Sequence, residues 1–263
     1  MHLKMLDRII QDKKEEVKIL KSNQKHTIAD VLDMEFEKRE FYSSLRTKIE
    51  SGKNAIIAEL KKHSPSKGML NQNLDIAEFS KIYEDSGAAC ISVLTDRIHF
   101  HGKIDDLITA KKSVKLPILR KDFIIDESQI IQSKLIGADC ILLIVACLSK
   151  TQLHDLLTIS KKLNMEVLLE VHDRNELDIA LESECKIIGI NNRNLKTFNV
   201  SINTSLELCE AINDDDIIVI SESGIKDIET IEKLNSKNIK SFLVGESLIM
   251  NSDPKLLLKT LVG

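Results

Sequence analysis

The chain has 263 residues, of which 43% are hydrophobic and 30% are charged, a composition typical of a globular protein with a sizeable core. The formal net charge is −4 and lysines alternate with carboxylates, so the sequence predicts no basic surface of the kind that binds nucleic acid. Apolar stretches are too short to span a bilayer, and we expect neither a signal peptide nor a membrane anchor in the charged first 20 residues.

The cysteines predict a reducing compartment. There are five, an odd number, mostly beside apolar runs and without a Cys-x-x-Cys pair. This usage is typical of packed thiols in a cytoplasmic protein. His99 and His101 could face the same way on a strand, but no nearby residue completes a ligand set, so we expect no metal site.

Residues 1–50 are predicted to be helical. Leu6, Ile9 and Val17 recur at roughly helical spacing among charges, and a second stretch with helical spacing ends before Gly52. We expect this region to be an N-terminal helical extension packed over the main domain.

From residue 55 onward, short apolar segments alternate with helical ones. The expected strands are 55–60, 91–94, 117–120, 141–145, 166–170, 187–190, 217–220 and 241–244. The expected helices are 76–84, 104–112, 127–135, 151–163, 175–181, 205–211, 228–234 and 254–261. Strands this apolar are buried on both faces, and their alternation with helices indicates parallel pairing through right-handed crossovers.

Eight such units in this length favour an α/β fold of the (β/α)8 (TIM) barrel type. We predict a single domain over residues 1–263, with the extension at 1–50 and the barrel at 51–263. A doubly wound open sheet is the alternative, but no Gly-x-Gly-x-x-Gly motif follows the first expected strand.

Charged or polar residues follow seven of the eight expected strands, where a barrel of this type places its active site. They are Glu59, Lys61, Thr95, Asp96, Arg120, Lys121, Asp122, Glu170, Asn191, Asn192, Arg193, Ser221, Glu222, Ser223, Gly224, Gly245, Glu246 and Ser247. Any one of them is most simply a solvated loop residue. Glutamates and lysines that meet at one rim, however, shift one another's pKa and prepare acid and base roles.

Two glycine-containing turns predict an anion site. Ser223-Gly224 and Gly245-Glu246 follow the last two expected strands, where backbone N–H groups often bind phosphate in this fold. Ordinary helix caps are the alternative, and both interpretations can hold together. The lysines and hydroxyls of the loop at 61–68 suit either a mobile loop that closes over an anionic ligand or a plain turn.

Seven stretches, in order along the chain, closely resemble the indole-3-glycerol phosphate synthase family. They are IAELK at 57–61, SPSKG at 64–68, LRKDF at 119–123, LLEV at 168–171, GINNR at 189–193, SESGI at 221–225 and LVGES at 243–247. The charged helical start resembles that family's extra N-terminal segment, so the resemblance covers the whole chain. One departure is IHFHG at 98–102, where relatives usually carry a more aromatic stretch.

The resemblance implies a lyase of tryptophan biosynthesis. Such an enzyme converts 1-(2-carboxyphenylamino)-1-deoxyribulose 5-phosphate to indole-3-glycerol phosphate and releases carbon dioxide and water, with neither metal nor organic cofactor. A Schiff-base aldolase remains an alternative, because a lysine at a strand end beside carboxylates suits that chemistry too. A phosphosugar isomerase and a catalytically silent barrel that binds a phosphorylated metabolite are further alternatives.

The resemblance also implies roles for individual residues. Lys121 matches the general acid that protonates the keto oxygen as the aromatic carbon attacks, and Glu170 matches the base or cation stabiliser. Glu59 and Lys61 are placed to assist, and the division of acid work between the two lysines stays open. The residues that match substrate-positioning and supporting groups are Asn191, Glu222 and Ser223.

Further matches concern substrate binding. Arg193 is expected to contact an anionic group, and Phe123 to pack against the anthranilate ring. The phosphate is expected at Ser64, Gly224, Gly245 and Glu246, the last three chiefly through backbone N–H groups.

We expect a cytoplasmic monomer that acts on a small phosphorylated substrate, without a nucleic-acid or membrane partner. Association with other enzymes of the tryptophan pathway is compatible with the sequence. The whole interpretation requires Glu59, Lys61, Lys121 and Glu170 to share one rim of the barrel.

Overall fold

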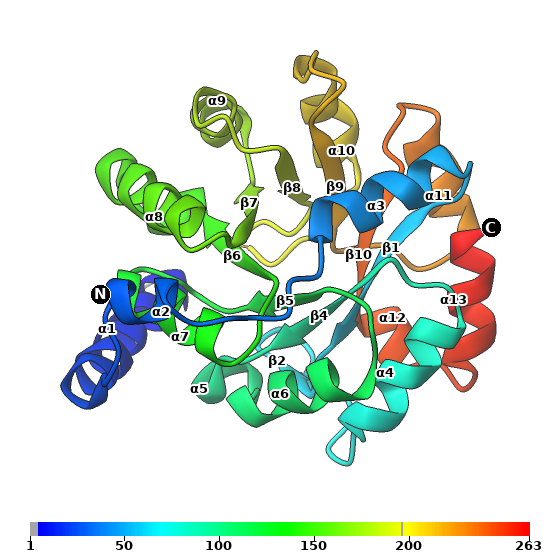
Figure 1. Cartoon of the computed structure of the whole chain (residues 1–263). Helices are drawn as coiled ribbons and strands as arrows, with labels where there is room; N and C mark the ends of the chain where they lie inside the picture. Colours follow the sequence, from blue (N-terminus) through cyan, green and yellow to red (C-terminus); the bar gives the residue numbers. More distant parts are fainter. Residues whose placement is uncertain (1–4, 196) are drawn as a thin grey trace.

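The computed structural model describes residues 5–195 and 197–263. A closed barrel of parallel strands, in the order β1-β10-β9-β8-β7-β6-β5-β4, forms its centre (Figure 1). The strands are β1 (Ala55–Leu60), β4 (Cys90–Leu94), β5 (Ile118–Lys121), β6 (Cys140–Ile144), β7 (Glu166–Val171), β8 (Ile187–Asn191), β9 (Ile218–Glu222) and β10 (Ser241–Val244). These are the predicted strands, with ends that agree within two residues, and the (β/α)8 barrel prediction is confirmed.

The first strand closes the barrel. β1 pairs in parallel with β4 on one side and with β10 on the other, which an open doubly wound sheet does not allow. Because all eight strands run in the same direction, their C-terminal ends meet at one rim.

The helices surround the barrel, as Figure 1 shows. They are α4 (Ile76–Asp85), α6 (Ile104–Ser113), α7 (Glu127–Leu135), α8 (Lys150–Lys162), α9 (Arg174–Glu182), α10 (Asn203–Leu208), α11 (Ile228–Asn235) and α13 (Pro254–Val262). Shorter turns of helix are α5 (Arg97–Phe100), α12 (Glu246–Ile249), η1 (Val145–Cys147) and η2 (Cys209–Ala211). Side-chain caps fix several helix starts: Ser149 accepts from the N–H of Gln152 in a reciprocal capping box at α8, a contact that stabilises a helix by about 1 kcal/mol.

Alternation along the strands divides the core into two layers. One set of side chains, such as Ile56 and Val93, packs outward against the helices. The other set, which includes Ile57, Leu119 and Leu168, fills the inside of the barrel. Both layers are aliphatic, as expected for a parallel sheet that is buried on both faces.

The N-terminal extension consists of α1 (Met5–Asn23), α2 (Ile28–Leu32) and α3 (Phe41–Glu50). In Figure 1, α3 lies across the barrel, whereas α1 lies beside α7. Phe41 and Leu45 of α3 are fully buried in the same cluster as the barrel interior, and the N–H groups of Phe41 and Tyr42 donate to the carboxylate of Glu166 at the start of β7. The third helix therefore covers the N-terminal end of the barrel.

The loop after β1 contains a small hairpin that the sequence did not predict. β2 (His63–Ser64) and β3 (Gly68–Met69) pair antiparallel, and Gly68 has a φ of 74° at the turn. Two-residue strands are too short to give an alternating pattern, so periodicity could not reveal them.

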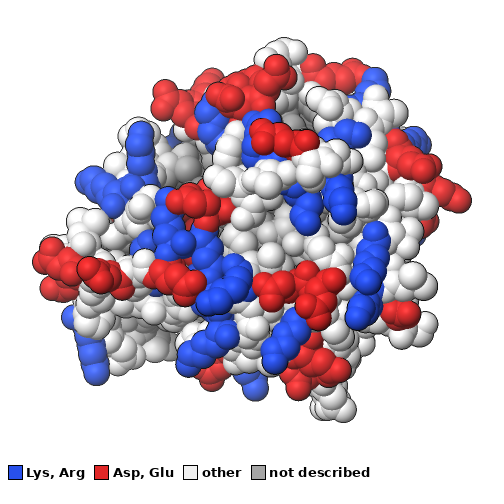
Figure 2. Space-filling view, turned by 45° about the vertical axis from the view of Figure 1, so that its right-hand side comes forward, with Lys and Arg blue, Asp and Glu red and all other residues white. Residues whose placement is uncertain are grey.

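Charges of both signs are interleaved on the surface that Figure 2 shows, in keeping with the small net charge of −4. Among the helices in the described ranges, none combines the length and the apolar character that crossing a membrane requires.

Candidate active site

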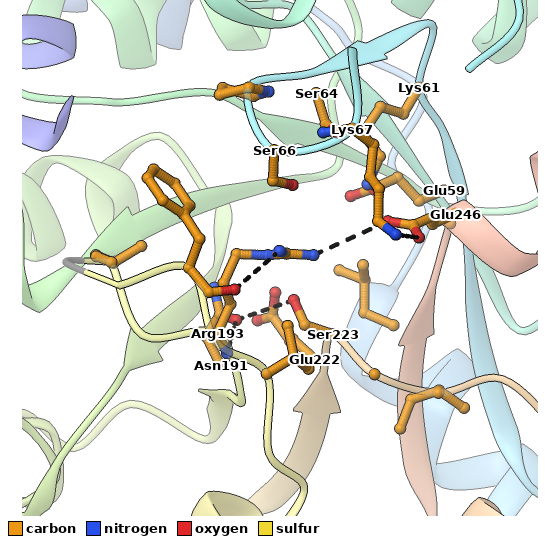
Figure 3. Close-up of a pocket in the computed structure, with 18 of the residues that line it drawn as sticks. Glu59, Lys61, Ser64, Ser66, Lys67, Asn191, Arg193, Glu222, Ser223 and Glu246 are labelled. Carbon is orange, nitrogen blue, oxygen red and sulfur yellow. Dashed lines mark hydrogen bonds and ion pairs between the residues drawn. The ribbon is translucent and has the colours of Figure 1, made fainter. Parts of the chain in front are cut away.

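A cavity of about 1230 Å³ opens at the C-terminal rim of the barrel (Figure 3). The structure places at its wall every residue to which the family resemblance assigns a role: Glu59, Lys61, Ser64, Lys121, Phe123, Glu170, Asn191, Arg193, Glu222, Ser223, Gly224, Gly245 and Glu246. These residues are distant in sequence but close in space, because the C-terminal ends of all the parallel strands lie at one rim of the barrel. Glu59, Lys61, Lys121 and Glu170 therefore share one rim of the barrel, as the sequence interpretation requires.

Lys121 lies at the centre of the site, at the end of β5. Its Nζ is 2.8 Å from Glu170 Oε2 on β7 and 2.7 Å from Glu222 Oε2 on β9. Burial alone would lower the pKa of Lys121, but the charges of Glu170 and Glu222 outweigh it and hold the pKa above its usual value. The ammonium group therefore keeps its proton at neutral pH.

The pKa values of the two carboxyl groups that contact Lys121 are shifted in opposite directions. Burial raises the pKa of Glu222 to about 8 against the opposing charge of Lys121, and the neighbouring Glu170 adds to the rise. Burial also acts to raise the pKa of Glu170, but Lys121 and His172 reverse the effect and hold it well below its usual value. These opposite directions favour a proton on Glu222 and a negative charge on Glu170 near neutral pH.

Two glycines make room for these carboxyl groups. A Cβ atom at Gly189 of β8 would overlap Glu222 Oε1, and one at Gly245 would lie 2.5 Å from Glu59 Oε1. Any larger residue at either position would displace a carboxyl group that lines the cavity. Gly245 was predicted only as a backbone contact for phosphate, so this close approach is an addition from the structure.

Glu59 and Lys61 form a second lysine–carboxylate pair at the end of β1. Lys61 Nζ lies 2.6 Å from Glu59 Oε1, and the Glu59 side chain is buried whereas that of Lys61 is partly exposed. The two residues are two positions apart and therefore project from the same face of the chain, as the sequence predicted.

Asn191 connects Glu170, one of the two glutamates that contact Lys121, to the neighbouring loops. Its Nδ2 donates to Glu170 Oε1 at 3.2 Å, and its Oδ1 accepts from Ser223 Oγ at 3.0 Å. Oδ1 also accepts from the N–H of Arg193 at 3.0 Å. Ser223 has a φ of 66°, a strained conformation for a non-glycine residue, and its hydrogen bond to Asn191 helps to hold it.

The predicted phosphate contacts Ser64, Gly224, Gly245 and Glu246 all line the cavity, and Figure 3 labels Ser64 and Glu246 at its wall. Helix α12 begins at Gly245 without a side-chain cap, which leaves its first N–H groups available to an anion. Lys67 Nζ and Arg193 Nη2 lie 3.6 Å and 3.9 Å from the carboxylate of Glu246. Two cations and an uncapped helix start are therefore present at this place.

Arg120 was grouped with the rim charges, but the structure places it away from the cavity. It projects from the opposite face of β5, where its guanidinium donates to Gln129 O, Ser133 Oγ and Thr95 Oγ1. Side chains alternate along a strand, so Arg120 and Lys121, which are neighbours within β5, project from opposite faces of the strand.

Lys13 is a residue that the sequence analysis missed. It lies in α1, its side chain is 2% exposed, and its Nζ is 3.0 Å from Asp96 Oδ2, 2.9 Å from Asp122 Oδ1 and 2.6 Å from Glu16 Oε2. This cluster fastens α1 to the ends of β4 and β5. One signal was present in the sequence: Lys13 occupies the middle of the apolar stripe Ile9–Lys13–Val17 on a helix.

His172 was missed as well. It follows β7, two residues after Glu170, and both of its ring nitrogens face carboxylate oxygens. Within the two described ranges, no group of three or more His, Cys, Asp and Glu side chains is arranged to hold a metal ion.

A closed (β/α)8 barrel with a lysine between two carboxyl groups in a cavity at its C-terminal rim is typical of a barrel enzyme, whose active site lies at that rim. The family model for indole-3-glycerol phosphate synthase matches residues 6–261. The chain belongs to the indole-3-glycerol phosphate synthase family.

Individual relatives agree with this assignment. The indole-3-glycerol phosphate synthase of Polaromonas sp. is 43% identical over 260 residues, which cover 98% of each chain. That of Bordetella pertussis is 48% identical over 225 residues, 86% of each chain. A solved structure of KGPDC from Streptococcus mutans has a TM-score of 0.59 and 11% identity over 79% of this chain and 95% of its own; at that identity the likeness shows the fold alone.

Proposed function

We propose that this protein is an indole-3-glycerol phosphate synthase of tryptophan biosynthesis. It converts 1-(2-carboxyphenylamino)-1-deoxyribulose 5-phosphate to indole-3-glycerol phosphate with release of carbon dioxide and water. Family membership over residues 6–261 supports the reaction. The observation that carries the chemistry is the contact of Lys121 with Glu170 and Glu222 at the cavity wall.

Lys121 serves as the general acid of ring closure in this proposal. The keto oxygen of the substrate must gain a proton as the aromatic carbon attacks, and Lys121 holds one because two carboxyl groups surround its ammonium. Glu170 is ionised and faces the same cavity, so it can stabilise the cationic intermediate or accept a proton. Loss of the carboxylate as carbon dioxide then restores the aromatic ring, and dehydration completes the indole.

Lys61 is the second acid of the proposed mechanism. Its Nζ lies 2.6 Å from Glu59 Oε1 at the end of β1, on the opposite side of the rim from β7. The substrate's keto oxygen gains a proton in ring closure and a further proton when it leaves as water, so the two lysines share the acid work between them.

The remaining contacts orient the substrate. Ser64 and the backbone of Gly224, Gly245 and Glu246 hold the phosphate, a proposal that the uncapped start of α12 supports. Phe123 forms the aromatic wall for the anthranilate ring, with the ring of Phe100 6.1 Å away. The supporting residues, with their contacts described above, are Asn191, Arg193, Glu222 and Ser223.

The structure favours this chemistry over a Schiff-base aldolase. An amine that attacks a carbonyl must first lose its proton, whereas Glu170 and Glu222 hold the proton on Lys121. A phosphosugar isomerase would turn over without release of carbon dioxide. A silent barrel would not need the two lysine–carboxylate pairs.

We also propose that the protein acts in the cytoplasm, on a small phosphorylated substrate, as a monomer. All five cysteines are free, as expected in a reducing compartment. Contacts of Lys13 in α1 and Phe41 in α3 with the barrel of the same chain support the monomer. Light scattering coupled to size exclusion measures the mass directly.

A fluorescence assay tests the function. The chain has no tryptophan, so an indole product gives emission without a protein background, and carbon dioxide should appear in equal amount. Lys121→Ala should lower kcat at least about 10³-fold, since it removes the proposed acid, while a phosphate-bearing product analogue still binds. Lys18→Ala, at an exposed lysine of α1, is the matched control and should leave kcat unchanged. Normal turnover by Lys121→Ala would overturn the assignment of the acid, and turnover without carbon dioxide would overturn the reaction.

A further inference from the structure

His172, whose side chain is 10% exposed, lies behind the proposed base. Its Nε2 lies 3.3 Å from Glu170 Oε1, and its Nδ1 lies 3.0 Å from Glu176 Oε2 of α9. Glu176 Oε2 also accepts from the backbone N–H of His172 at 2.9 Å. The ring thus lies between two carboxylates: Nδ1 is hydrogen-bonded to Glu176, whereas Nε2 is buried near Glu170 without a hydrogen-bond partner among the described residues.

Lys121 by itself cannot decide where the negative charge of its carboxyl pair resides. It lies at almost equal distances from Glu170 and Glu222, 2.8 Å and 2.7 Å. Two ionised carboxylates beside one ammonium in a buried site leave an uncompensated charge, so one of them takes up a proton. Another group must therefore determine which of the two carboxyl groups is protonated.

The surroundings of the two carboxyl groups differ on the side away from Lys121. Glu170 Oε1 faces both the amide of Asn191 and the ring of His172. Glu222 Oε1 is buried and has no hydrogen-bond partner among the residues that the structure describes. Since an amide is neutral, the imidazole is the group that can add a positive charge on the Glu170 side.

The closeness of a carboxylate oxygen to each ring nitrogen of His172 favours a doubly protonated ring. A neutral imidazole has one N–H and would turn a lone pair toward one of the two carboxylates. Burial alone would lower the pKa of His172, but Glu170 and Glu176 raise it to about 10. Other titratable side chains near these glutamates are Lys121, which contacts Glu170, Glu222 beside it, and Cys147 of η1, a thiol whose pKa burial raises so that it stays neutral.

We propose that His172 is a positioning residue which fixes the negative charge of the carboxyl pair on Glu170 and leaves the shared proton on Glu222. The proposal rests on the role of Glu170 in the proposed function. It explains how a nearly symmetric lysine contact produces one base and one neutral carboxyl group.

Nitrogen NMR on the unmodified protein tests the protonation directly. With both ring nitrogens of His172 assigned, we expect an imidazolium spectrum at pH 8, where an unperturbed histidine is neutral. A neutral ring at this pH would overturn the proposal. The measurement needs no substrate, so its outcome is independent of whether the proposed reaction is correct.

Kinetics test the consequence. His172→Asn and His172→Gln remove the cation, so kcat should fall about 10- to 100-fold with KM changed less than about threefold, as for other groups that orient a reacting side chain. The acid limb of the kcat–pH profile should move upward by about one unit or more, because Glu170 loses a neighbouring positive charge. An unmoved acid limb in both variants would contradict the proposal.

Two further variants complete the design. His154→Asn alters an exposed histidine of α8 and should leave the profile unchanged. Glu170→Gln separates the two levels of inference: full activity in that variant would remove the proposed role of Glu170 in the reaction, while the His172 spectrum of the unmodified protein would stand as an independent result.

Discussion

Glu222 connects the chemistry of the site to pH at the scale of a single residue. Its proton is held with a pKa of about 8, chiefly because the carboxyl group is buried. Above that pH Lys121 faces two carboxylates in place of one. A second negative charge at 2.7 Å makes Lys121 a weaker acid, so we expect kcat to decline above about pH 8.

Glu222→Gln provides the test. The amide keeps the shape of the carboxyl group but cannot ionise, so the decline above about pH 8 should disappear, whatever the loss in absolute kcat. The measurement is kcat at saturating substrate across the alkaline range, with Glu15→Gln at an exposed glutamate of α1 as control. An unchanged alkaline limb in Glu222→Gln would assign that limb to another group.

The sequence could predict which residues line the site but not their protonation. Lys121, Glu170 and Glu222 each end an apolar strand, and the barrel topology brings such ends together. The distances between them depend on packing, and only those distances show that one lysine meets two carboxyl groups. His172 was missed for the same reason, since a lone histidine near a strand end has no distinctive spacing.

At the scale of the element, α1 is fastened to the catalytic rim by one buried lysine. Lys13 is surrounded by Asp96, Asp122 and Glu16, and Asp96 in turn accepts from the N–H of His99 at the start of α5. Ile9, one turn earlier in the helix, lines the cavity. The cluster therefore links the extension to the loops that carry the site.

We expect Lys13→Met to lower the free energy of unfolding by about 3 kcal/mol or more, because it leaves the buried Asp96 without its cation and Asp122 with Arg120 alone. Urea denaturation measures the change. Lys18→Met removes an exposed ion pair of the same helix and should cost less than about 1 kcal/mol. Equal stability of the two variants would show that the buried cluster does not fasten α1.

Elements differed in how well the sequence predicted them. The eight barrel strands were clear because both of their faces are buried and apolar. The placement of α1 at one end of the barrel and of α3 at the other was not predictable, since both helices show the same amphipathic pattern. Only long-range partners, such as Glu166 for α3, distinguish the two ends.

For the whole molecule, the buried groups of the site couple folding to pH. A group whose pKa is higher in the folded state binds a proton on folding, so its contribution to stability is lost as pH rises toward the folded value. The stabilising contribution of His172 is therefore lost between pH 6.5 and about pH 10, and that of Glu222 between pH 4.5 and about pH 8. Glu170 acts in the opposite direction, because its lowered pKa makes stability fall in acid.

The free energy of unfolding should therefore decrease from about pH 6.5 to pH 9.5, with His172 contributing up to about 1.4 kcal/mol per pH unit. His172→Asn cannot take up that proton, so its stability should vary less over this range and approach that of the wild type at the alkaline end. Denaturant titrations at several pH values measure both curves, with His154→Asn as the control. Parallel curves for His172→Asn and the wild type would mean that His172 binds no extra proton on folding, and the charge on Glu170 would then need another source.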